Sequence, residues 1–212
     1  MDSKSKVRHV VFDIFGTLIK FGIQHHPFRQ LLKLARENGR QVRPDDARMV
    51  MTINGDLEYI GNELGINPPS ELVQKLEWQI GDELSSLTLF DDVVPTLNAL
   101  QSRGIKIGLC SNLAQPYGAA IDRLLAGFDL KHFLSYELSI IKPEAQIYQS
   151  ILSSFNCSAE QCLFVGDTFE ADYVGPTAMG MKAVHLVRSG VTQSYQITSL
   201  TEVLNYVDEN NQ

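Results

Sequence analysis

The stretch HVVFDIFGT, over residues 9–17, decides the fold of this chain. Its residues Val10, Val11 and Phe12 form a continuous apolar run, partly β-branched, of the kind found in strands buried on both faces. Such strands occur in parallel sheets that helices cover on both sides, so the run predicts a central parallel strand. Asp13 ends the run, and we therefore expect a carboxylate at the carboxyl end of this strand.

The region over residues 21–86 has the apolar spacing of helices. Apolar residues recur there at intervals of three and four, which predicts amphipathic helices over 28–38, 50–64 and 70–86. Ser70 follows two prolines and is expected to cap the third of these helices. An all-helical insertion is thus expected soon after the first strand.

From residue 87 onward, strand-like and helix-like patterns alternate. Strands are expected over 105–110, 133–136, 162–165 and 182–186, with helices between them. This order predicts an α/β protein in which an open parallel sheet carries the helical insertion. Ligands of such sheets bind beyond the carboxyl ends of the strands, which is also where the insertion leaves the sheet.

Polar side chains lie where three of these strands end. Asp13 and Thr17 follow the first strand, Ser111 follows the second, and Asp167 follows the fourth, with Asp172 a little further on. Each of them alone could be a helix cap or a turn residue. Because the carboxyl ends of parallel strands lie at one edge of a sheet, these side chains are expected to lie close together.

Together these residues make the chain resemble the haloacid dehalogenase-like (HAD) hydrolase superfamily, in particular the subfamily I type with a helical cap. The family's four motifs are matched, in the family's order, by DIFGT at 13–17, SN at 111–112, KP at 142–143, and GD at 166–167 with Asp172. The resemblance covers nearly the whole chain.

That resemblance implies a division of the chain into two parts. Residues 1–20 and 87–212 would form a Rossmann-like core with a parallel sheet of five strands. Residues 21–86 would form a mobile, all-helical cap above the active site, hinged near residues 20–21 and 87–90.

The resemblance also implies a chemistry. Asp13 would be the nucleophile, which attacks in line and forms a covalent aspartyl intermediate that water later cleaves. Ser111 and Lys142 would hold the transferring group, and Asn112 and Thr17 would also contact the substrate. An ammonium group beside Asp13 would neutralise charge on phosphoryl oxygens and keep Asp13 ionised.

A magnesium ion is the cofactor that the resemblance implies. Its ligands would be the side chains of Asp13, Asp167 and Asp172 and the backbone carbonyl of Phe15, which are hard oxygen donors. Charge supports the same expectation, because carboxylates crowded at one strand edge repel each other unless a divalent cation lies between them.

Phe15 is where the sequence departs from the family's pattern. In the phosphatases of this superfamily, an aspartate two residues after the nucleophile protonates the leaving group and then activates water. Its loss removes an acid-base group worth roughly two to four powers of ten in rate. We therefore expect a magnesium-dependent hydrolase of a phosphorylated small molecule that has a good leaving group.

Two other interpretations stay open. An aromatic residue at Phe15, with Ser111-Asn112, resembles the L-2-haloacid dehalogenases, which attack carbon and need no metal, although Gly166-Asp167 is unlike them. Alternatively, a core with phosphate and metal ligands but no acid-base group could bind a phosphorylated metabolite without processing it.

Composition limits the partners and the compartment. Eighteen basic and 25 acidic residues give a net charge of −7 at pH 7, which disfavours nucleic acid and anionic membranes as main partners. Cys110, Cys157 and Cys162 are an odd number without metal-ligand spacing, and no export or anchoring segment is recognisable. A cytoplasmic protein is therefore expected, and its oligomeric state is left open.

The roles of three ring-bearing residues in the insertion are also left open. His25 and His26 precede Pro27, and they could reach down to the site or simply begin a helix. Trp78 could pack within the insertion or form a wall of the substrate pocket.

Overall fold

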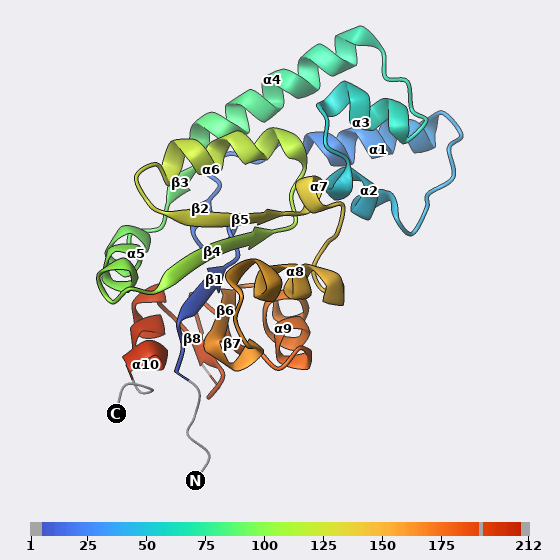
Figure 1. The fold of residues 1–212 in the computed structure, drawn as a ribbon. Helices are drawn as coiled ribbons and strands as arrows, with labels where there is room; N and C mark the ends of the chain where they lie inside the picture. Colours follow the sequence, from blue (N-terminus) through green and yellow to red (C-terminus); the bar gives the residue numbers. More distant parts are fainter. Residues whose placement is uncertain (1–5, 191–192, 209–212) are drawn as a thin grey trace.

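The computed structural model describes residues 6–190 and 193–208. Residues 1–5, on which the expectation of no export segment partly depends, lie outside the described residues. The centre of the fold is a parallel sheet of six strands in the order β5-β4-β1-β6-β7-β8 (Figure 1). The strands are β1 (His9–Phe12), β4 (Lys106–Ser111), β5 (Leu130–Leu134), β6 (Cys162–Gly166), β7 (Lys182–Leu186) and β8 (Gln196–Ile197). The prediction of an α/β fold with a parallel sheet is confirmed.

The first predicted strand lies at the centre of the sheet, as expected. β1 pairs with β4 on one side and with β6 on the other, and Phe12 lies opposite Leu109 and Val165. Its side chains alternate between the two faces: Val10 and Phe12 belong to one hydrophobic cluster and Val11 belongs to the other. Both clusters need apolar residues, which explains the continuous run in the sequence.

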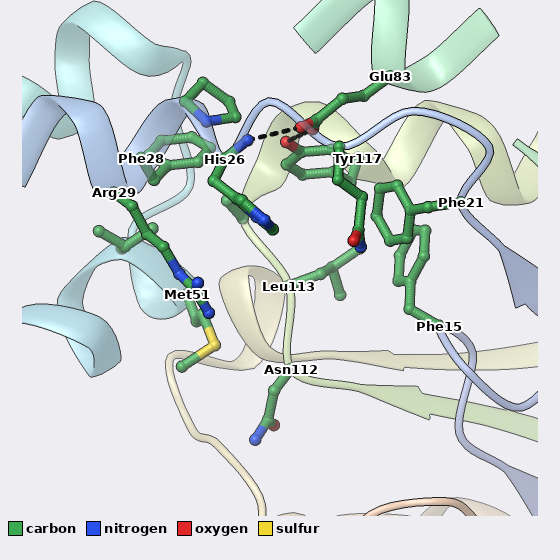
Figure 2. A pocket seen from close by; sticks show the side chains of 14 residues that line it. Phe15, Phe21, His26, Phe28, Arg29, Met51, Glu83, Asn112, Leu113 and Tyr117 are labelled. Atoms are coloured by element: carbon green, nitrogen blue, oxygen red, sulfur yellow. Dashed lines mark hydrogen bonds between the residues drawn. The ribbon is translucent and has the colours of Figure 1, made fainter. Parts of the chain in front are cut away.

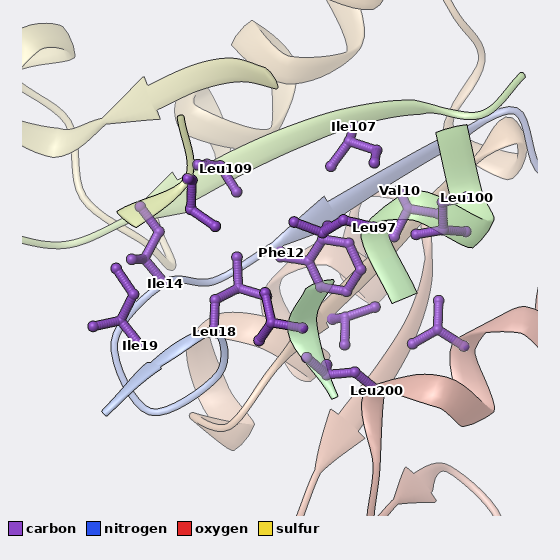
Figure 3. Packing of buried hydrophobic residues seen from close by; sticks show 14 of the residues in the cluster. Val10, Phe12, Ile14, Leu18, Ile19, Leu97, Leu100, Ile107, Leu109 and Leu200 are labelled. Carbon is purple, nitrogen blue, oxygen red and sulfur yellow. The ribbon is translucent and has the colours of Figure 1, made fainter. Parts of the chain in front are cut away.

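Helices cover both faces of this sheet. Those of the core are α5 (Val93–Ser102), α6 (Ala119–Leu124), α7 (Ser135–Leu138), α8 (Ala145–Phe155), α9 (Gly175–Ala178) and α10 (Val203–Asp208). On the Phe12 face, α5, α6 and α10 contribute buried side chains, and Figure 3 shows Leu97 and Leu100 of α5 packed there. On the Val11 face, α8 contributes Ile147 and Ile151. The site at the strand ends therefore stands on a core packed from both sides.

Two strand expectations are corrected. The third predicted strand, 133–136, is placed too late, because β5 ends at Leu134 and Tyr136 lies in α7. β5 is an edge strand whose residues Lys131 and His132 are exposed, so it lacks the apolar run of a central strand. The sheet also has six strands where five were expected, because the two-residue strand β8 pairs with the end of β7.

The helices of the insertion lie together, apart from the sheet (Figure 1). They are α1 (Pro27–Glu37), α2 (Asp46–Thr52), α3 (Leu57–Glu63) and α4 (Ser70–Ser86). The chain enters this helical segment through β2 (Ile19–Lys20) and leaves it through β3 (Thr88–Leu89), and these two strands pair antiparallel. The two crossings are thus adjacent in space.

Two helix expectations inside this segment are also corrected. The single helix expected over 50–64 is two helices, because Asp56 caps α3 through a hydrogen bond from the Tyr59 amide at 2.8 Å. Ser70 does not cap α4, since the helix already begins at Ser70 and Pro69 precedes it in an extended conformation. Among the helices of the described residues, none is long and apolar enough to cross a membrane.

The two faces of α5 give a test of this packing. Leu97 is fully buried and Val94 on the same helix is 42% exposed. We expect Leu97→Ala to lower the free energy of unfolding by about 2–5 kcal/mol, because it removes buried methyl groups and leaves a cavity. Val94→Ala, the control, should change it by less than about 0.5 kcal/mol in the same urea titration. Equal effects of the two substitutions would contradict the placement of α5.

Candidate active site

A buried lysine joins two of the predicted carboxylates. The Lys142 Nζ atom lies 2.7 Å from Asp13 Oδ1 and 2.6 Å from Asp172 Oδ1, and all three side chains are almost fully buried. Asp13 follows β1, Lys142 precedes α8, and Asp172 lies in the π-helical turn Phe169–Val174 after β6. The sheet order places β1 beside β6, so the carboxyl ends of these strands bring the two carboxylates together.

Burial acts in opposite directions on the pKa of a carboxyl group and on the pKa of an ammonium group. Burial raises the pKa of Asp13 to about 6, Lys142 opposes this change, and the carboxylates of Asp172 and Asp167 add to it. Burial alone would lower the pKa of Lys142, but the carboxylates of Asp13 and Asp172 outweigh that effect and raise it. The lysine therefore stays charged at neutral pH.

Two glycines make room for the acidic side chains. Gly16 has a φ of +91°, and a Cβ atom there would lie 2.3 Å from Asp167 Oδ2. A Cβ atom on Gly166 would lie 2.3 Å from the carboxyl carbon of Asp172. Gly16 meets Asp167 because the loops after β1 and β6 converge, and Gly166 meets Asp172 because the turn after β6 folds back on the end of its own strand. Larger residues at these positions would displace the carboxylates.

The three carboxylates can hold a cation together. Asp13, Asp167 and Asp172 each offer an oxygen, and these oxygens all lie within 4.8 Å of one another. When all three are ionised, the ammonium group of Lys142 leaves two negative charges uncompensated. Burial, followed by the carboxylate of Asp172, raises the pKa of Asp167 above its ordinary value. Hard oxygen donors with excess negative charge fit Mg²⁺ or a similar divalent cation.

The remaining predicted residues lie around this cluster. Thr17 is fully buried, and its hydroxyl donates to Asp167 Oδ1 at 3.4 Å. Ser111 is the last residue of β4 and is buried. The Asn112 side chain donates to the Lys142 carbonyl and accepts from the Lys142 amide, both at 2.8 Å, so it fixes the backbone that carries the lysine. Contacts of these residues with a substrate stay predictions, as does a metal bond from the Phe15 carbonyl.

Sequence reasoning missed an ion pair that contacts the loop after β1. Arg188 follows β7, and its guanidinium binds both oxygens of Asp92 at 3.0 and 3.2 Å and the Thr17 carbonyl at 2.6 Å. It also lies 3.6 Å from the centre of the Phe90 ring. An arginine just beyond a strand end was the available signal, but nothing in the sequence links it to the distant residues 17 and 90–92.

An aromatic cavity lies between the helical segment and the core, and its lining includes Asn112, which binds the Lys142 backbone (Figure 2). Its volume is about 360 Å³, and four of its lining residues are phenylalanine or tyrosine: Phe15, Phe21, Phe28 and Tyr117. The Phe15 ring stacks on Phe21 with 5.1 Å between centroids, and Tyr117 lies edge-on to both. Phe15 thus forms a wall of the cavity.

A buried glutamate joins the helical segment to the core at this cavity. Glu83 of α4 is only 2% exposed, and it accepts hydrogen bonds from the backbone amides of His25 and His26 and from the Tyr117 hydroxyl. Burial, and then the hydrogen bond to Glu83, raise the pKa of Tyr117, so its hydroxyl keeps the proton that it donates.

The structure separates the three residues whose roles were open. His26 lines the cavity, whereas the imidazole of His25 bonds to Asp82 at 2.7 Å. Trp78 is 66% exposed and does not line this cavity, and its ring lies 5.8 Å from that of His25.

Comparison with known proteins places this geometry among hydrolases. Residues 7–180 match the family model described as a haloacid dehalogenase-like hydrolase. The glyceraldehyde 3-phosphate phosphatase of Methanothermobacter thermautotrophicus is 31% identical over 112 residues, which are 50% of this chain and 47% of that protein. The chain spans about half the length of the curated relatives that it matches.

Solved structures show the same fold. The 2-haloacid dehalogenase of Pseudomonas syringae pv. Tomato DC3000 has a TM-score of 0.65 at 18% identity, covering 96% of this chain and 99% of that one. A HAD-hydrolase of Bacillus subtilis bound to magnesium has a TM-score of 0.62 at 17% identity, covering 96% and 100%. Both dehalogenases and magnesium-bound hydrolases thus share this fold, so the fold alone does not select the reaction.

The carboxylate cluster predicts pH-dependent stabilisation by magnesium. The pKa of Asp13 rises from 3.8 to about 6 on folding, so without metal its ionisation destabilises the fold as the pH rises through this window. A metal ion and this proton compete for the same carboxylate of Asp13. We therefore expect Mg²⁺ to raise the melting temperature more at about pH 7 than at about pH 5. Asp167→Asn should remove most of this rise in melting temperature. A rise that is the same at both pH values and in Asp167→Asn would contradict the proposed metal site.

Gly166 gives a second test. Gly166→Ala places a Cβ atom against Asp172, so we expect a loss of about 1–3 kcal/mol of stability and a weaker thermal shift with Mg²⁺. Gly81→Ala in α4 is the matched control, because a Cβ atom there meets nothing within 4 Å. That variant should gain about 0.5–1 kcal/mol from helix propensity and keep the magnesium response. Unchanged stability and magnesium response in Gly166→Ala would contradict the crowding.

Proposed function

The chain belongs to the haloacid dehalogenase-like hydrolase family, and we propose that it is a magnesium-dependent phosphatase acting on a phosphorylated small molecule through a covalent intermediate on Asp13. The observation that carries this proposal is the buried contact of Asp13 with Lys142, beside a cluster of three carboxylates suited to a divalent cation. A phosphoryl group placed there would meet a nucleophile and a compensating positive charge.

Asp13 carries out the first step. A carboxylate oxygen of Asp13 attacks the phosphorus atom and forms an aspartyl phosphate, and the bond from phosphorus to the leaving oxygen breaks. Lys142 favours the ionised form of Asp13, opposing the effect of burial, and can neutralise charge on the phosphoryl oxygens. The hydroxyl of Ser111, at the adjacent strand end, would donate to the same oxygens. A magnesium ion held by Asp13, Asp167 and Asp172 would supply further positive charge.

The cavity and the curated relatives support the substrate class. A volume of about 360 Å³ suits a small molecule, and the aromatic wall favours an apolar or planar leaving group. The curated relatives include phosphatases of glyceraldehyde 3-phosphate and of ribulose-1,5-bisphosphate, which are small sugar phosphates. With Phe15 in place of an acid, aryl and acyl phosphates should be hydrolysed more readily than alkyl phosphates.

The helical segment, residues 21–86, is proposed to be the cap of this site. The adjacent strands β2 and β3 would form its hinge. Contacts with the core support a closed arrangement: Arg48 of α2 binds Glu144 at 2.6 Å, and the Ser135 hydroxyl donates to the Met51 carbonyl at 2.6 Å. A closed cap would exclude water that could otherwise compete before the aspartyl phosphate forms.

Dehalogenation is the second candidate, because Phe15 and the pair Ser111-Asn112 resemble the dehalogenase motifs. The carboxylate cluster favours the phosphatase, since a metal-independent dehalogenase would leave these charges uncompensated. A chain that binds phosphorylated metabolites without turnover is the third possibility.

Substrate assays with an Asp13 variant test this proposal. We expect magnesium-dependent phosphate release from p-nitrophenyl phosphate and from an acyl phosphate, and trapping of one phosphoryl group on Asp13 after a rapid acid quench. Asp13→Asn should lose turnover by at least about three powers of ten, because an amide is a poor nucleophile. Asp172 still pairs with Lys142 in that variant, so a native melting curve serves as the folding control.

The same assays separate the alternatives. Halide release from 2-chloropropionate without metal would replace the phosphatase by a dehalogenase. Magnesium binding without any turnover would favour a binding protein. Full phosphatase activity in Asp13→Asn would overturn the assignment of the nucleophile.

A further inference from the structure

The proposed reaction lacks a source for one proton. The oxygen that leaves phosphorus must be protonated unless it is already a stable anion, and Phe15 carries no proton to give. The cavity beside Phe15 is where the leaving group would lie. Its lining residues on the helical segment therefore include the groups that could take over this task.

His26 lines the cavity in a position from which it could protonate the leaving oxygen. The side chain is exposed to the cavity, and Figure 2 shows its ring between Arg29 and Tyr117, pointing into the space above Leu113 and Asn112. Across the described residues, the imidazole of His26 makes no hydrogen bond or ion pair, so a ring nitrogen is available to a ligand. Histidine is also the side chain that most often transfers protons in enzymes.

The backbone of His26 is held in a conformation that few side chains adopt. Its φ and ψ are 57° and 54°, in the left-handed region, and the next residue is Pro27. Its amide donates to Glu83 Oε1 at 2.8 Å, and its carbonyl accepts from the amides of Arg29 and Gln30 at 3.0 and 3.2 Å. Such strained positions persist only where the surroundings fix them, and they cluster at functional sites.

The surroundings of His26 also differ from those of its neighbour. The charged or titratable groups that line the cavity with His26 are Glu83, Arg29 and Tyr117, and Glu83 is already occupied by two amides and a hydroxyl. The imidazole of His25 is bonded to Asp82 and does not line the cavity. The two adjacent histidines therefore provide a test residue and a matched control.

We infer that His26 is a catalytic residue of this site, which donates the proton to the leaving group in place of the aspartate that Phe15 replaces. This inference rests on the proposed function. As the Asp13 oxygen bonds to phosphorus, the electron pair of the breaking bond goes to the leaving oxygen, which takes a proton from the imidazolium of His26. The neutral imidazole then accepts a proton from the water whose oxygen bonds to phosphorus, and the bond from phosphorus to the Asp13 oxygen breaks, which frees the Asp13 carboxylate. Inorganic phosphate leaves, and His26 is again protonated.

Leaving-group dependence tests this role. We expect His26→Asn to lower kcat/KM about 100-fold or more on an alkyl phosphate such as glycerol phosphate, and to change it little on p-nitrophenyl phosphate, whose leaving group needs no proton. Asparagine tolerates the left-handed backbone better than most residues, so the local fold should persist. His25→Asn, the control, should keep both activities, and melting curves check the folding of each variant.

A second variant keeps the inference testable if His26→Asn is poorly folded. Phe15→Asp restores the usual acid, so adding His26→Asn to it should cost little on the alkyl phosphate. Equal losses of kcat/KM on both substrates in His26→Asn would overturn the proton-donor role. So would a loss on the alkyl phosphate that is as large when His26→Asn is added to Phe15→Asp as when it is made alone. If the unaltered chain hydrolyses neither substrate, the proposed function fails and takes the inference with it. Hydrolysis that His26→Asn leaves unchanged overturns the inference alone.

Discussion

The ammonium group of Lys142 is the charge around which the site is organised. A buried charge is tolerated only when it is paired and hydrogen-bonded, and Lys142 meets this condition through two carboxylates, one of them 129 residues away in the sequence. Removing either partner would leave the lysine less well compensated. The strand order of the sheet, the loop before α8 and the turn after β6 are therefore constrained together by one side chain.

Further interactions hold the parts of the chain that carry this charge. Asn112 binds both backbone groups of Lys142, and Arg188 ties the end of β7 to the Thr17 carbonyl and to Asp92. The Asp92 carboxylate also accepts from the Ser199 hydroxyl and the Leu200 amide, so the C-terminal region is joined to the same network. The loop after β1 is thereby positioned from two sides, which favours a preorganised site.

Much of the core could be predicted because its rules are local or topological. The apolar run before Asp13 indicates a central strand, and the convergence of parallel strand ends predicts that Asp13 and Asp167 lie together. The strand over 133–136 was misplaced because β5, at the edge, has the exposed residues Lys131 and His132. The helix expected over 50–64 was wrong because apolar spacing continues across a break that Asp56 caps.

The cavity could not be predicted, because its residues come from segments that the sequence does not relate. Phe21 and Phe28 lie on the helical segment and Tyr117 on the core. Only the packing brings the rings of Phe21 and Tyr117 to Phe15 and the ring of Phe28 to Tyr117. Glu83 lies three residues after Ile80 on the buried face of α4, and its hydrogen bonds to two amides and Tyr117 could not be read from that spacing. His25 and His26 are adjacent in sequence, yet the His25 imidazole bonds to Asp82 whereas His26 lines the cavity.

The pairing of β2 with β3 has a consequence for how such a chain can diversify. Because the entry and exit strands are hydrogen-bonded neighbours, everything between them is, for the core, one closed loop with fixed ends. The entropic cost of closing a loop grows only slowly with its length, so segments of very different size could be exchanged there at little thermodynamic expense. Ligand-binding residues in the inserted segment could then change without any change in the strand register of the core.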